Sequence, residues 1–314
     1  MAANQASPTT PQTRSTANPT SNPDVYVITG GAGGMGLATV EILGTRKTAT
    51  ILLSDINEDV LNDAKQHLTD NSKIKATIET QVCDVSNPDD ATALSQKAVS
   101  LGGTLRGVVH TAGVSPSMGN AEKILEINVA GTIYIDRAFL PLATDGFTMV
   151  NVASMAAYML PNAMLPKRAY KAVAQGPTHL LAKLAKRVNL LPKSARPGLA
   201  YSISKNFVTW YTGHLAGVFG AADAHIVSVS PGSFDTKMGQ LEKDAGAGAM
   251  VDYAAIKRFG RPEEVGQLLA WLVRESPVYL TGTDILIDGG VVSQMSLKDM
   301  MAAGSAGSKK PATE

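Results

Sequence analysis

The chain has 314 residues and a formal net charge of +1, with five scattered histidines and a single cysteine. The absence of a basic stripe argues against nucleic acid as a partner. No apolar run reaches the length of about 18 residues that a spanning helix needs. The sequence contains no Cys/His cluster of the kind that binds a metal. Cys83 cannot form an internal disulfide, and we interpret it as a small buried hydrophobe. We therefore expect a cytoplasmic protein that binds no metal, nucleic acid or membrane.

Both ends of the chain have the composition of disordered segments. Residues 1–23 and 302–314 are rich in small and polar side chains, so they bury too little surface to offset the entropy of ordering. The first segment also lacks the apolar region of a secretory signal, and its single arginine argues against a transit peptide. Residues 24–295 remain, which are enough for one domain with a sizeable core.

Between these ends, short apolar runs alternate with amphipathic stretches. The predicted strands, in chain order, are 25–29, 50–55, 78–84, 105–113, 147–154, 224–232 and 283–290. The predicted helices are 37–45, 57–68 with Asn57 as N-cap, 88–100, 121–142 and 262–273. Strands that alternate with helices of this length indicate βαβ units, and hence an α/β fold with a doubly wound parallel sheet covered on both faces.

Segment 155–199 interrupts the alternation. It is rich in proline and contains one predicted amphipathic helix, in which Leu180, Leu184 and Val188 share a face. The basic residues Lys183, Lys186 and Arg187 point away from that face, which we interpret as a solvated surface. The segment is therefore predicted to be a helical insertion rather than a second domain.

A glycine-rich stretch, TGGAGGMG, runs from Thr29 to Gly36 at the end of the first predicted strand. Such glycines permit a tight turn and let backbone amides approach a pyrophosphate at a helix N-terminus. The stretch could equally be a structural turn.

An acidic residue, Asp55, follows Gly30 by 25 positions, at the end of the second predicted strand. A carboxylate in that place accepts hydrogen bonds from a ribose diol and repels a 2′-phosphate. Neither residues 31–33 nor Ile56 offers a cation to hold such a phosphate. The pattern favours NAD over NADP, and helix capping by Asp55 is the alternative.

Far downstream, Tyr201 and Lys205 stand four positions apart. Together with the glycine-rich stretch, this spacing resembles the short-chain dehydrogenase/reductase family, whose other motifs follow here in the family's order from about Val25 to Gly290. The matching segments are Thr29-Gly30-x-x-x-Gly34-x-Gly36, Asp84-Val85, His110-Thr111-Ala112-Gly113 in place of Asn-Asn-Ala-Gly, Asn128-Val129-Ala130-Gly131, Ser154, Pro231-Gly232-Ser233-Phe234-Asp235-Thr236 and Asp288-Gly289-Gly290. The resemblance implies a Rossmann-type fold and an oxidoreductase.

The chain departs from the family pattern at two places. His110 and Thr111 replace two asparagines that usually brace the sheet, which puts stability rather than chemistry in question. Ser154 and Tyr201 lie 47 positions apart, much further than in most members, and a similar insertion occurs in the bacterial 3α-hydroxysteroid dehydrogenase/carbonyl reductase subgroup. In most members the helices around these residues pack against a neighbouring subunit. We therefore expect a homo-oligomer in which the insertion blocks or rebuilds that contact.

The resemblance also implies a role for each site residue. Tyr201 would be the general acid or base, with its phenolate stabilised by Lys205. Ser154 would hold the substrate oxygen, and Asn128 would anchor a water that relays protons to Lys205. The implied cofactor-binding residues are Gly30, Gly34, Met35, Gly36, Asp55, Asp84, Val85, Ala112, Gly113, Tyr201, Lys205, Pro231, Gly232, Phe234 and Thr236.

Two other tyrosines, Tyr158 and Tyr170, lie close to Ser154 in the sequence. They have Asn162 and Ala174 four positions later, so neither can recruit a lysine in the way that Tyr201 does.

These features predict an NAD(H)-dependent oxidoreductase that interconverts a secondary alcohol and a ketone. The insertion and segment 237–253 are expected to shape the substrate pocket. Segment 237–253 is glycine-rich at its centre and carries Met238 and Met250, which is the composition of a mobile apolar lid. A lipophilic cyclic or steroid-like substrate is therefore expected. Two alternatives stay open: an epimerase or dehydratase that retains NAD, and a non-catalytic NAD-binding module.

Overall fold

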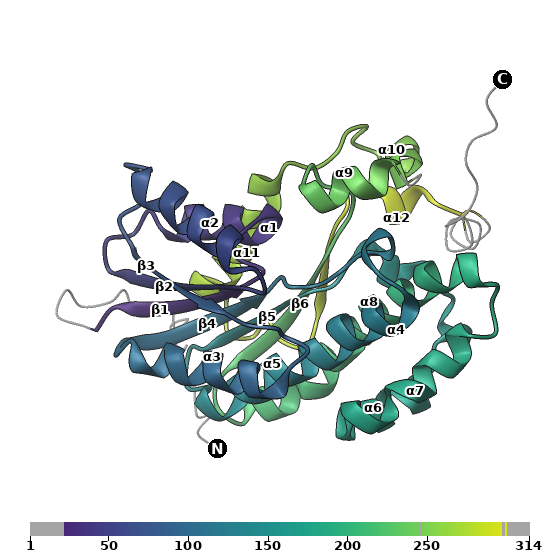
Figure 1. Cartoon of the computed structure of the whole chain (residues 1–314), viewed down its shortest axis with the longest axis horizontal. Helices are drawn as coiled ribbons and strands as arrows, with labels where there is room; N and C mark the ends of the chain where they lie inside the picture. The colour runs from purple at the N-terminus through teal and green to yellow at the C-terminus, as the bar shows by residue number, and fades with distance from the viewer. Residues whose placement is uncertain (1–21, 245–246, 297–298, 300–314) are drawn as a thin grey trace, which may run out of the picture.

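The computed structural model describes residues 22–244, 247–296 and 299, so residues 1–21 of the first predicted tail and all of the second lie outside it. Seven parallel strands form one sheet in the order β3-β2-β1-β4-β5-β6-β7. The strands are β1 (Asp24–Thr29), β2 (Ala49–Asp55), β3 (Thr77–Val82), β4 (Thr104–His110), β5 (Thr148–Val152), β6 (His225–Pro231) and β7 (Asp284–Ile287). The predicted doubly wound, Rossmann-type α/β fold is confirmed (Figure 1).

Helices cover both faces of the sheet. They are α1 (Gly34–Leu43), α2 (Glu58–Asp70), α3 (Pro88–Ser100), α4 (Ala121–Leu125), α5 (Gly131–Phe139), α6 (Lys167–Gln175), α7 (Pro177–Val188), α8 (Arg196–Gly220), α9 (Lys237–Asp244), α10 (Met250–Tyr253), α11 (Pro262–Arg274) and α12 (Val291–Gln294). Helices α1, α2 and α11 pack on one face, and α3, α5 and α8 on the other (Figure 1). Because both faces are covered, the central strands are almost continuously buried.

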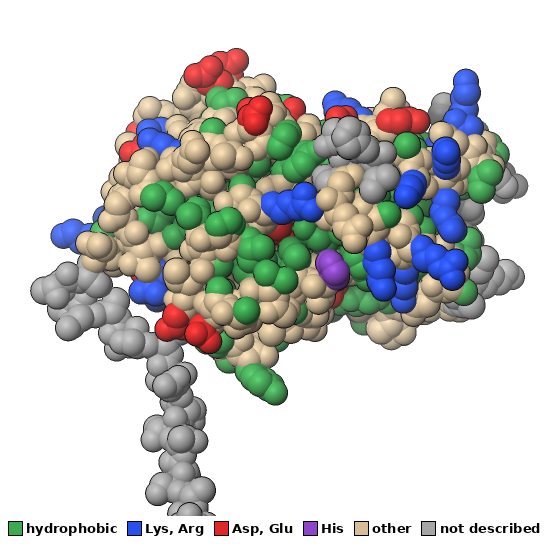
Figure 2. Space-filling model, turned by 90° about the horizontal axis from the view of Figure 1, so that it is seen from below, with side chains coloured by type: hydrophobic (Ala, Val, Ile, Leu, Met, Phe, Trp, Pro, Cys, Tyr) green, Lys and Arg blue, Asp and Glu red, His purple; other side chains and the backbone are tan. Residues whose placement is uncertain are grey.

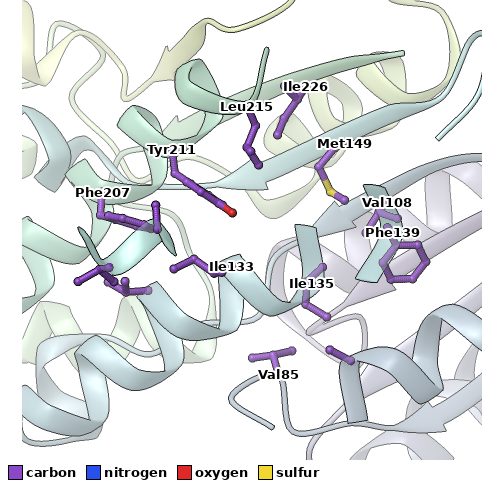
Figure 3. Packing of buried hydrophobic residues seen from close by; sticks show 14 of the residues in the cluster. Val85, Val108, Ile133, Ile135, Phe139, Met149, Phe207, Tyr211, Leu215 and Ile226 are labelled. Carbon is purple, nitrogen blue, oxygen red and sulfur yellow. The ribbon is translucent and has the colours of Figure 1, made fainter. Parts of the chain in front are cut away.

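The larger core lies between the sheet and the α3–α5–α8 layer. Figure 3 shows side chains of α5, α8 and three strands meeting there, among them Ile133, Ile135, Phe139, Phe207, Tyr211, Leu215, Val108, Met149 and Ile226. Cys83 is a free, buried cysteine in the same cluster, as predicted. Burial in this apolar surrounding raises the pKa of its thiol to about 11. The thiol is therefore inert at neutral pH.

The insertion contains two helices where the sequence predicted one. The chain breaks at Gly176, whose φ of −154° and ψ of 80° are not helical, and Pro177 then starts α7. Leu184 and Val188 are fully buried, which confirms the predicted apolar face at these two positions, while the side chain of Leu180 lies outside the described part. Helix α7 packs on α4 and α8 of the same chain, and α6 packs on α7 and α8.

The predicted helix 121–142 is also interrupted. A π-helical turn, η2 (Glu126–Ala130), separates α4 from α5. Such turns widen the helix by one residue and are frequent at functional sites. Asn128 lies within this turn.

None of the described helices is long and apolar enough to cross a bilayer. Within the same residues, His, Cys, Asp and Glu side chains form no group of three that could ligate a metal.

Candidate active site

The glycine-rich stretch forms a tight connection between β1 and α1. Gly30 and Gly34 have φ angles of +64° and +52°, which residues with a Cβ rarely adopt. A Cβ at Gly36 would collide with the carbonyl oxygen of Gly30. The sequence folds in this way because only glycine permits both the turn and the close crossing of α1 over β1.

The space in front of this loop suits a pyrophosphate. A Cβ on Gly33 would meet no atom within 4 Å, and α1 begins at the next residue, so the amides of its first turn lack intrahelical partners. Gly34, Met35 and Gly36 therefore offer backbone N–H groups and the positive end of a helix dipole.

Asp55 ends β2 next to this loop. Its Oδ1 accepts a hydrogen bond from the backbone N–H of Ile56 at 2.8 Å. The N-cap of α2 is Asn57, whose Oδ1 accepts from the N–H of Val60 at 3.1 Å. Asp55 is therefore not the helix cap, and its carboxylate lies at the carboxyl end of the sheet, where a ribose is bound in folds of this class.

The segments after β3 and β4 continue the same edge of the sheet. Asp84 accepts hydrogen bonds on Oδ1 from the backbone and hydroxyl of Ser86, at 2.9 and 2.6 Å, and Val85 is buried against Gly131. The backbone of Ala112 is held by the hydroxyl of Thr29 at 3.4 Å. These contacts fix the turns on which an adenine could rest.

Gly113 brings this edge into contact with the predicted catalytic groups. A Cβ at Gly113 would lie 3.0 Å from Oδ1 of Asn128 and 3.4 Å from Nζ of Lys205. Asn128 is held on three sides: its Oδ1 accepts from the N–H of Val114 at 2.9 Å, and its Nδ2 donates to the carbonyl of Val114 at 3.0 Å and to Oγ of Ser204 at 3.1 Å. The side chain of Asn128 is therefore fixed within the π-turn.

Lys205 is buried beneath the site. Its Nζ donates to the carbonyl of Val152 at 3.0 Å and lies 5.9 Å from the centre of the Tyr201 ring. Burial lowers the pKa of Lys205 to about 8, because a charged group loses hydration. The ammonium form therefore predominates at neutral pH.

Tyr201 and Ser154 meet through their side chains. Burial raises the pKa of Tyr201 to about 12, the hydrogen bond with Ser154 opposes this rise, and the charge of Glu242 adds to it. Ser154 also accepts a hydrogen bond from the N–H of Ala156 at 3.2 Å, which holds its hydroxyl at the start of η4 (Met155–Tyr158). The two hydroxyl groups thus form one polar corner.

The prediction that Lys205 stabilises the Tyr201 phenolate involves the nicotinamide cation as well, and it stays a prediction. Burial is the largest cause of the raised pKa of Tyr201, and the hydrogen bond with Ser154 opposes it. The ammonium of Lys205 is directed to the carbonyl of Val152.

The segment after β6 closes the site from the other side. Thr236 faces the phosphate loop, with its Cγ2 3.4 Å from the place of a Cβ on Gly34. Pro231 is buried, and Gly232 packs so closely on Asp288 that a Cβ would approach its Cα to 2.7 Å. Phe234 was predicted to contact the cofactor, and its ring is buried against Gly260.

Several contributors were missed by sequence reasoning. Ser204 links two parts of the site, since its hydroxyl donates to the carbonyl of Tyr201 at 2.8 Å and accepts from Asn128. Glu242, on α9, accepts from the N–H of Ser117 at 3.1 Å and so ties the predicted lid to the loop after β4. The position of Ser204 one residue before Lys205 was the only available signal, and nothing in the sequence marks Glu242.

A row of polar side chains crosses the sheet directly beneath the site. Ser54, Thr29, His110, Asn151 and Ser228 occupy the same register on five neighbouring strands and are all buried. They lie two residues beyond the apolar positions that face the α3–α5–α8 layer. The row therefore separates the apolar core from the catalytic edge.

His110 and Thr111 keep the bracing role of the asparagines that they replace. Nδ1 of His110 lies 2.7 Å from the hydroxyl of Thr29, and Thr111 donates to the carbonyl of Thr29 at 2.6 Å. Burial, together with the charge of Lys205, lowers the pKa of His110 to about 3. A neutral histidine thus joins β4 to β1.

An apolar cluster lies next to the segment that follows Ser154. Met159, Ala254, Val291 and Met295 form a small buried cluster. The partly buried side chains packed against it are Met155, Met250, Tyr253 and Val292. The segment that follows Ser154 therefore packs on α10 and α12 through methionine-rich contacts.

Together, the fold and this geometry define a nucleotide-binding α/β protein with a Ser–Tyr–Lys site at the carboxyl edge of its sheet. Comparison with known families agrees. The chain matches the family model described as short chain dehydrogenase over residues 24–199, and the one described as Enoyl-(Acyl carrier protein) reductase over residues 191–292. The protein therefore belongs to the short-chain dehydrogenase/reductase family of oxidoreductases, whose members use a nicotinamide cofactor.

Individual relatives extend over nearly the whole chain. Short-chain dehydrogenase/reductase bsc3 of Alternaria brassicicola is 32% identical over 273 residues, which cover 85% of this chain and 95% of that protein. 3beta-hydroxysteroid dehydrogenase 2 of Eggerthella lenta is 24% identical, with coverage of 87% and 96%. A short-chain type dehydrogenase/reductase from Mycobacterium ulcerans has a similar structure, with a TM-score of 0.69, 20% identity and coverage of 88% and 92%.

Proposed function

We propose that the protein is an NAD(H)-dependent oxidoreductase that interconverts a secondary alcohol and a ketone on a lipophilic, cyclic or steroid-like small molecule. The observation that carries the proposal is the meeting of Ser154, Tyr201 and Lys205 at the open edge of the sheet. Asn128 lies beside them, on the other side of Gly113. A non-catalytic nucleotide-binding module has no need of a buried lysine beside a tyrosine–serine pair.

The choice of NAD rests on Asp55. Its carboxylate ends β2 and is not used as a helix cap. The residues that could face a 2′-phosphate, Gly31, Ala32, Gly33 and Ile56, carry no positive charge. A 2′-phosphate would therefore meet repulsion without a cationic partner.

When bound, the nicotinamide would supply the hydride acceptor or donor. The chain's own residues then manage the substrate oxygen and its proton. Ser154 holds that oxygen by a hydrogen bond, and Tyr201 donates a proton to it during reduction or removes one during oxidation. Lys205 keeps a positive charge near the phenol oxygen, which favours the phenolate that remains after donation.

The preference for a lipophilic substrate rests on the methionine-rich cluster. Met155 directly follows Ser154 and packs against the cluster that Met159 and Met295 help to form. Methionine side chains adapt to irregular apolar ligands. The 3beta-hydroxysteroid dehydrogenase of Eggerthella lenta, by its name, acts on a steroid, and its similarity extends along 87% of this chain.

A turnover screen tests the proposal. Hydroxysteroids, cyclic terpenoid alcohols and small diketones are supplied with each of the two cofactors, and the absorbance of the reduced nicotinamide is followed. We expect turnover with NAD or NADH on at least one bulky apolar substrate. Binding of NADH without turnover of any alcohol or ketone would favour the non-catalytic module. Conversion of a substrate with no net change in the cofactor would favour the epimerase or dehydratase.

A further inference from the structure

The outer surface of the insertion is strongly basic. Between Asp145 and Asp223 the chain contains no acidic residue. The exposed cations of the two insertion helices and the turn after them are Lys167, Arg168, Lys171, Lys183, Lys186, Arg187 and Lys193, here called the basic α6–α7 face. Figure 2 shows Lys and Arg side chains gathered at the right of the view, where Figure 1 places α6 and α7.

These charges are not needed to attach the insertion. The buried side chains Tyr170, Val173, Leu184 and Val188 hold α6 and α7 to the core. Within the described residues, no ion pair involves the basic α6–α7 face. Arg196 differs from these cations, because it donates to the carbonyls of Asn189 and Leu191 and so caps the end of α7.

Several of the cations are placed unfavourably for the helices that carry them. Lys167 and Arg168 lie in the first turn of α6, where the positive end of the helix dipole repels them. Lys167 with Lys171, and Lys183 with Arg187, are like-charge pairs at i,i+4. Lys186 and Arg187, by contrast, lie in the last turn of α7, where the helix dipole favours cations. A partner that compensates the charge would relieve the unfavourable placements.

Neither the two ends of the chain nor a symmetric second copy supplies that partner. The first 21 residues contain no Asp or Glu, and residues 300–314 contain only Glu314. A symmetric contact between two basic α6–α7 faces would bring like charges together. An external polyanion would compensate these charges.

Two exposed apolar side chains favour a lipid bilayer over a nucleic acid as the polyanion. Leu190 is 84% exposed two residues after the end of α7, and Met164 is 54% exposed just before α6. Nucleic-acid surfaces instead combine cations with aromatic rings that stack on bases, and no aromatic residue of α6 or α7 is exposed among the described side chains. Cations surrounding protruding aliphatic side chains suit the headgroups and outer acyl region of a lipid bilayer.

We propose that the basic α6–α7 face docks the protein on the surface of an anionic phospholipid membrane. The expectation of no membrane partner rested on the lack of a spanning segment, which surface docking does not require. Helix α7 packs against η2, which carries Asn128, and α6 packs against α8, which carries Tyr201. Docking would thus place the flank of the active site next to a bilayer. The binding itself does not depend on the proposed substrate.

Vesicle flotation of the full chain tests the proposal. The probes are phosphatidylcholine vesicles with and without phosphatidylserine, at low and high salt. We expect about tenfold more protein bound to the anionic vesicles, and loss of this difference at high salt because the attraction is screened. The double variant Lys183→Glu/Lys186→Glu should lose most of the binding. The matched control, Lys47→Glu/Lys73→Glu, reverses two exposed cations near the opposite edge of the sheet and should bind like the wild type.

A second variant identifies the partner. Leu190→Ser should weaken vesicle binding and leave binding to heparin and to duplex RNA unchanged, since it removes only the apolar contact. Equal binding to neutral and anionic vesicles, equal loss in both double variants, or unchanged vesicle binding by Leu190→Ser would each overturn the proposal. Thermal melting of every variant shows whether a loss of vesicle binding is due to unfolding. A variant that changes turnover but not vesicle binding would bear on the proposed function alone.

Discussion

The hydroxyl of Tyr170, in the insertion, lies 3.1 Å from the backbone carbonyl of Ile203, midway between Tyr201 and Lys205 on α8. The same hydroxyl lies 3.2 Å from Oδ1 of Asn206. The Tyr170 ring is fully buried and packs edge-on against Phe207, with ring centres 5.4 Å apart. The insertion is therefore part of the support of the acid–base helix, rather than an appendage beside it.

This support predicts graded effects at Tyr170. Tyr170→Phe removes only the hydroxyl and should lower the free energy of unfolding by about 1 kcal/mol. Tyr170→Ala leaves a cavity and should cost about 3–5 kcal/mol. Denaturant unfolding measures both, with Tyr279→Phe as the control because Tyr279 is fully exposed. Wild-type stability of Tyr170→Ala would show that the insertion does not contribute to the core.

The acid–base pair gives a second prediction. Tyr201→Phe should lower kcat by about 100- to 10,000-fold and leave NADH affinity nearly unchanged, since the phenol supplies a proton and little binding. Lys205→Ala should impair both turnover and binding. Tyr158→Phe is the matched control, because the Tyr158 hydroxyl donates to Asp284 at 2.6 Å and not to the site. The mechanism would be wrong if Tyr201→Phe kept about a tenth of the wild-type kcat.

Cofactor choice gives a third prediction. Asp55→Ala combined with Ile56→Arg should raise kcat/KM for NADP relative to NAD by about tenfold or more, because it removes a repelling carboxylate and adds a guanidinium. Asp59→Ala, which removes an exposed acidic residue from the first turn of α2, is the control and should change neither value. A native protein that already prefers NADP would disprove the ribose role of Asp55.

The fold and most of the site could be predicted from the sequence, because both depend on local sequence patterns. The apolar runs become β1 to β7, and predicted helix 88–100 coincides with α3. The glycine turn needs Gly30, Gly34 and Gly36 for steric reasons that spacing alone reveals. Motif order then placed Ser154 and Tyr201 together, although 47 positions separate them.

What the sequence could not reveal depends on contacts between distant segments. The break between α6 and α7 occurs at a Gly-Pro pair within one amphipathic pattern. Because the spacing of apolar residues continues across this pair, the sequence does not reveal the break. The direction of the Tyr201 pKa depends on burial by the whole fold. The link between Glu242 and Ser117 joins two loops that share no pattern.

Asp136 gives a fourth prediction, on stability. This carboxyl on α5 is fully buried, accepts from Nδ2 of Asn151 at 2.9 Å, and has a pKa raised by burial to about 8. Oδ1 of Asp136 and Oδ1 of Asn151 are both buried acceptors without a partner among the described residues. Burial without a cationic partner disfavours the carboxylate, so the neutral acid is the form that fits the fold.

Because the folded state holds this proton more tightly than the unfolded state, its contribution to stability is complete at low pH. It is lost as pH rises from about 4, the ordinary carboxyl value, toward the folded-state pKa of about 8. Across that range the unfolding free energy of the wild type should fall relative to Asp136→Asn by up to about 1.4 kcal/mol per pH unit. Urea unfolding of both proteins at several pH values measures the difference. Parallel pH profiles would mean that Asp136 is ionised in the folded protein.

Assembly gives the last prediction. Helix α7 covers part of α4, η2 and α8, the flank through which most members of the family, by the resemblance noted above, contact a neighbouring subunit. The outer side of that cover is the basic α6–α7 face, so a second copy placed there would meet repulsion. We therefore expect a dimer formed through another surface, such as the half-exposed edge strand β7.

Mass photometry should report this dimer, and hydrogen exchange at several dilutions should locate its interface. Exchange in β7 should quicken as the dimer dissociates, whereas exchange in α6 and α7 should not change, because these helices are held by their own subunit through Tyr170, Leu184 and Val188. A tetramer in which α7 becomes protected on assembly would contradict the prediction. In that case the like charges of the basic α6–α7 face would repel each other across the interface, and high salt would strengthen the tetramer by screening that repulsion.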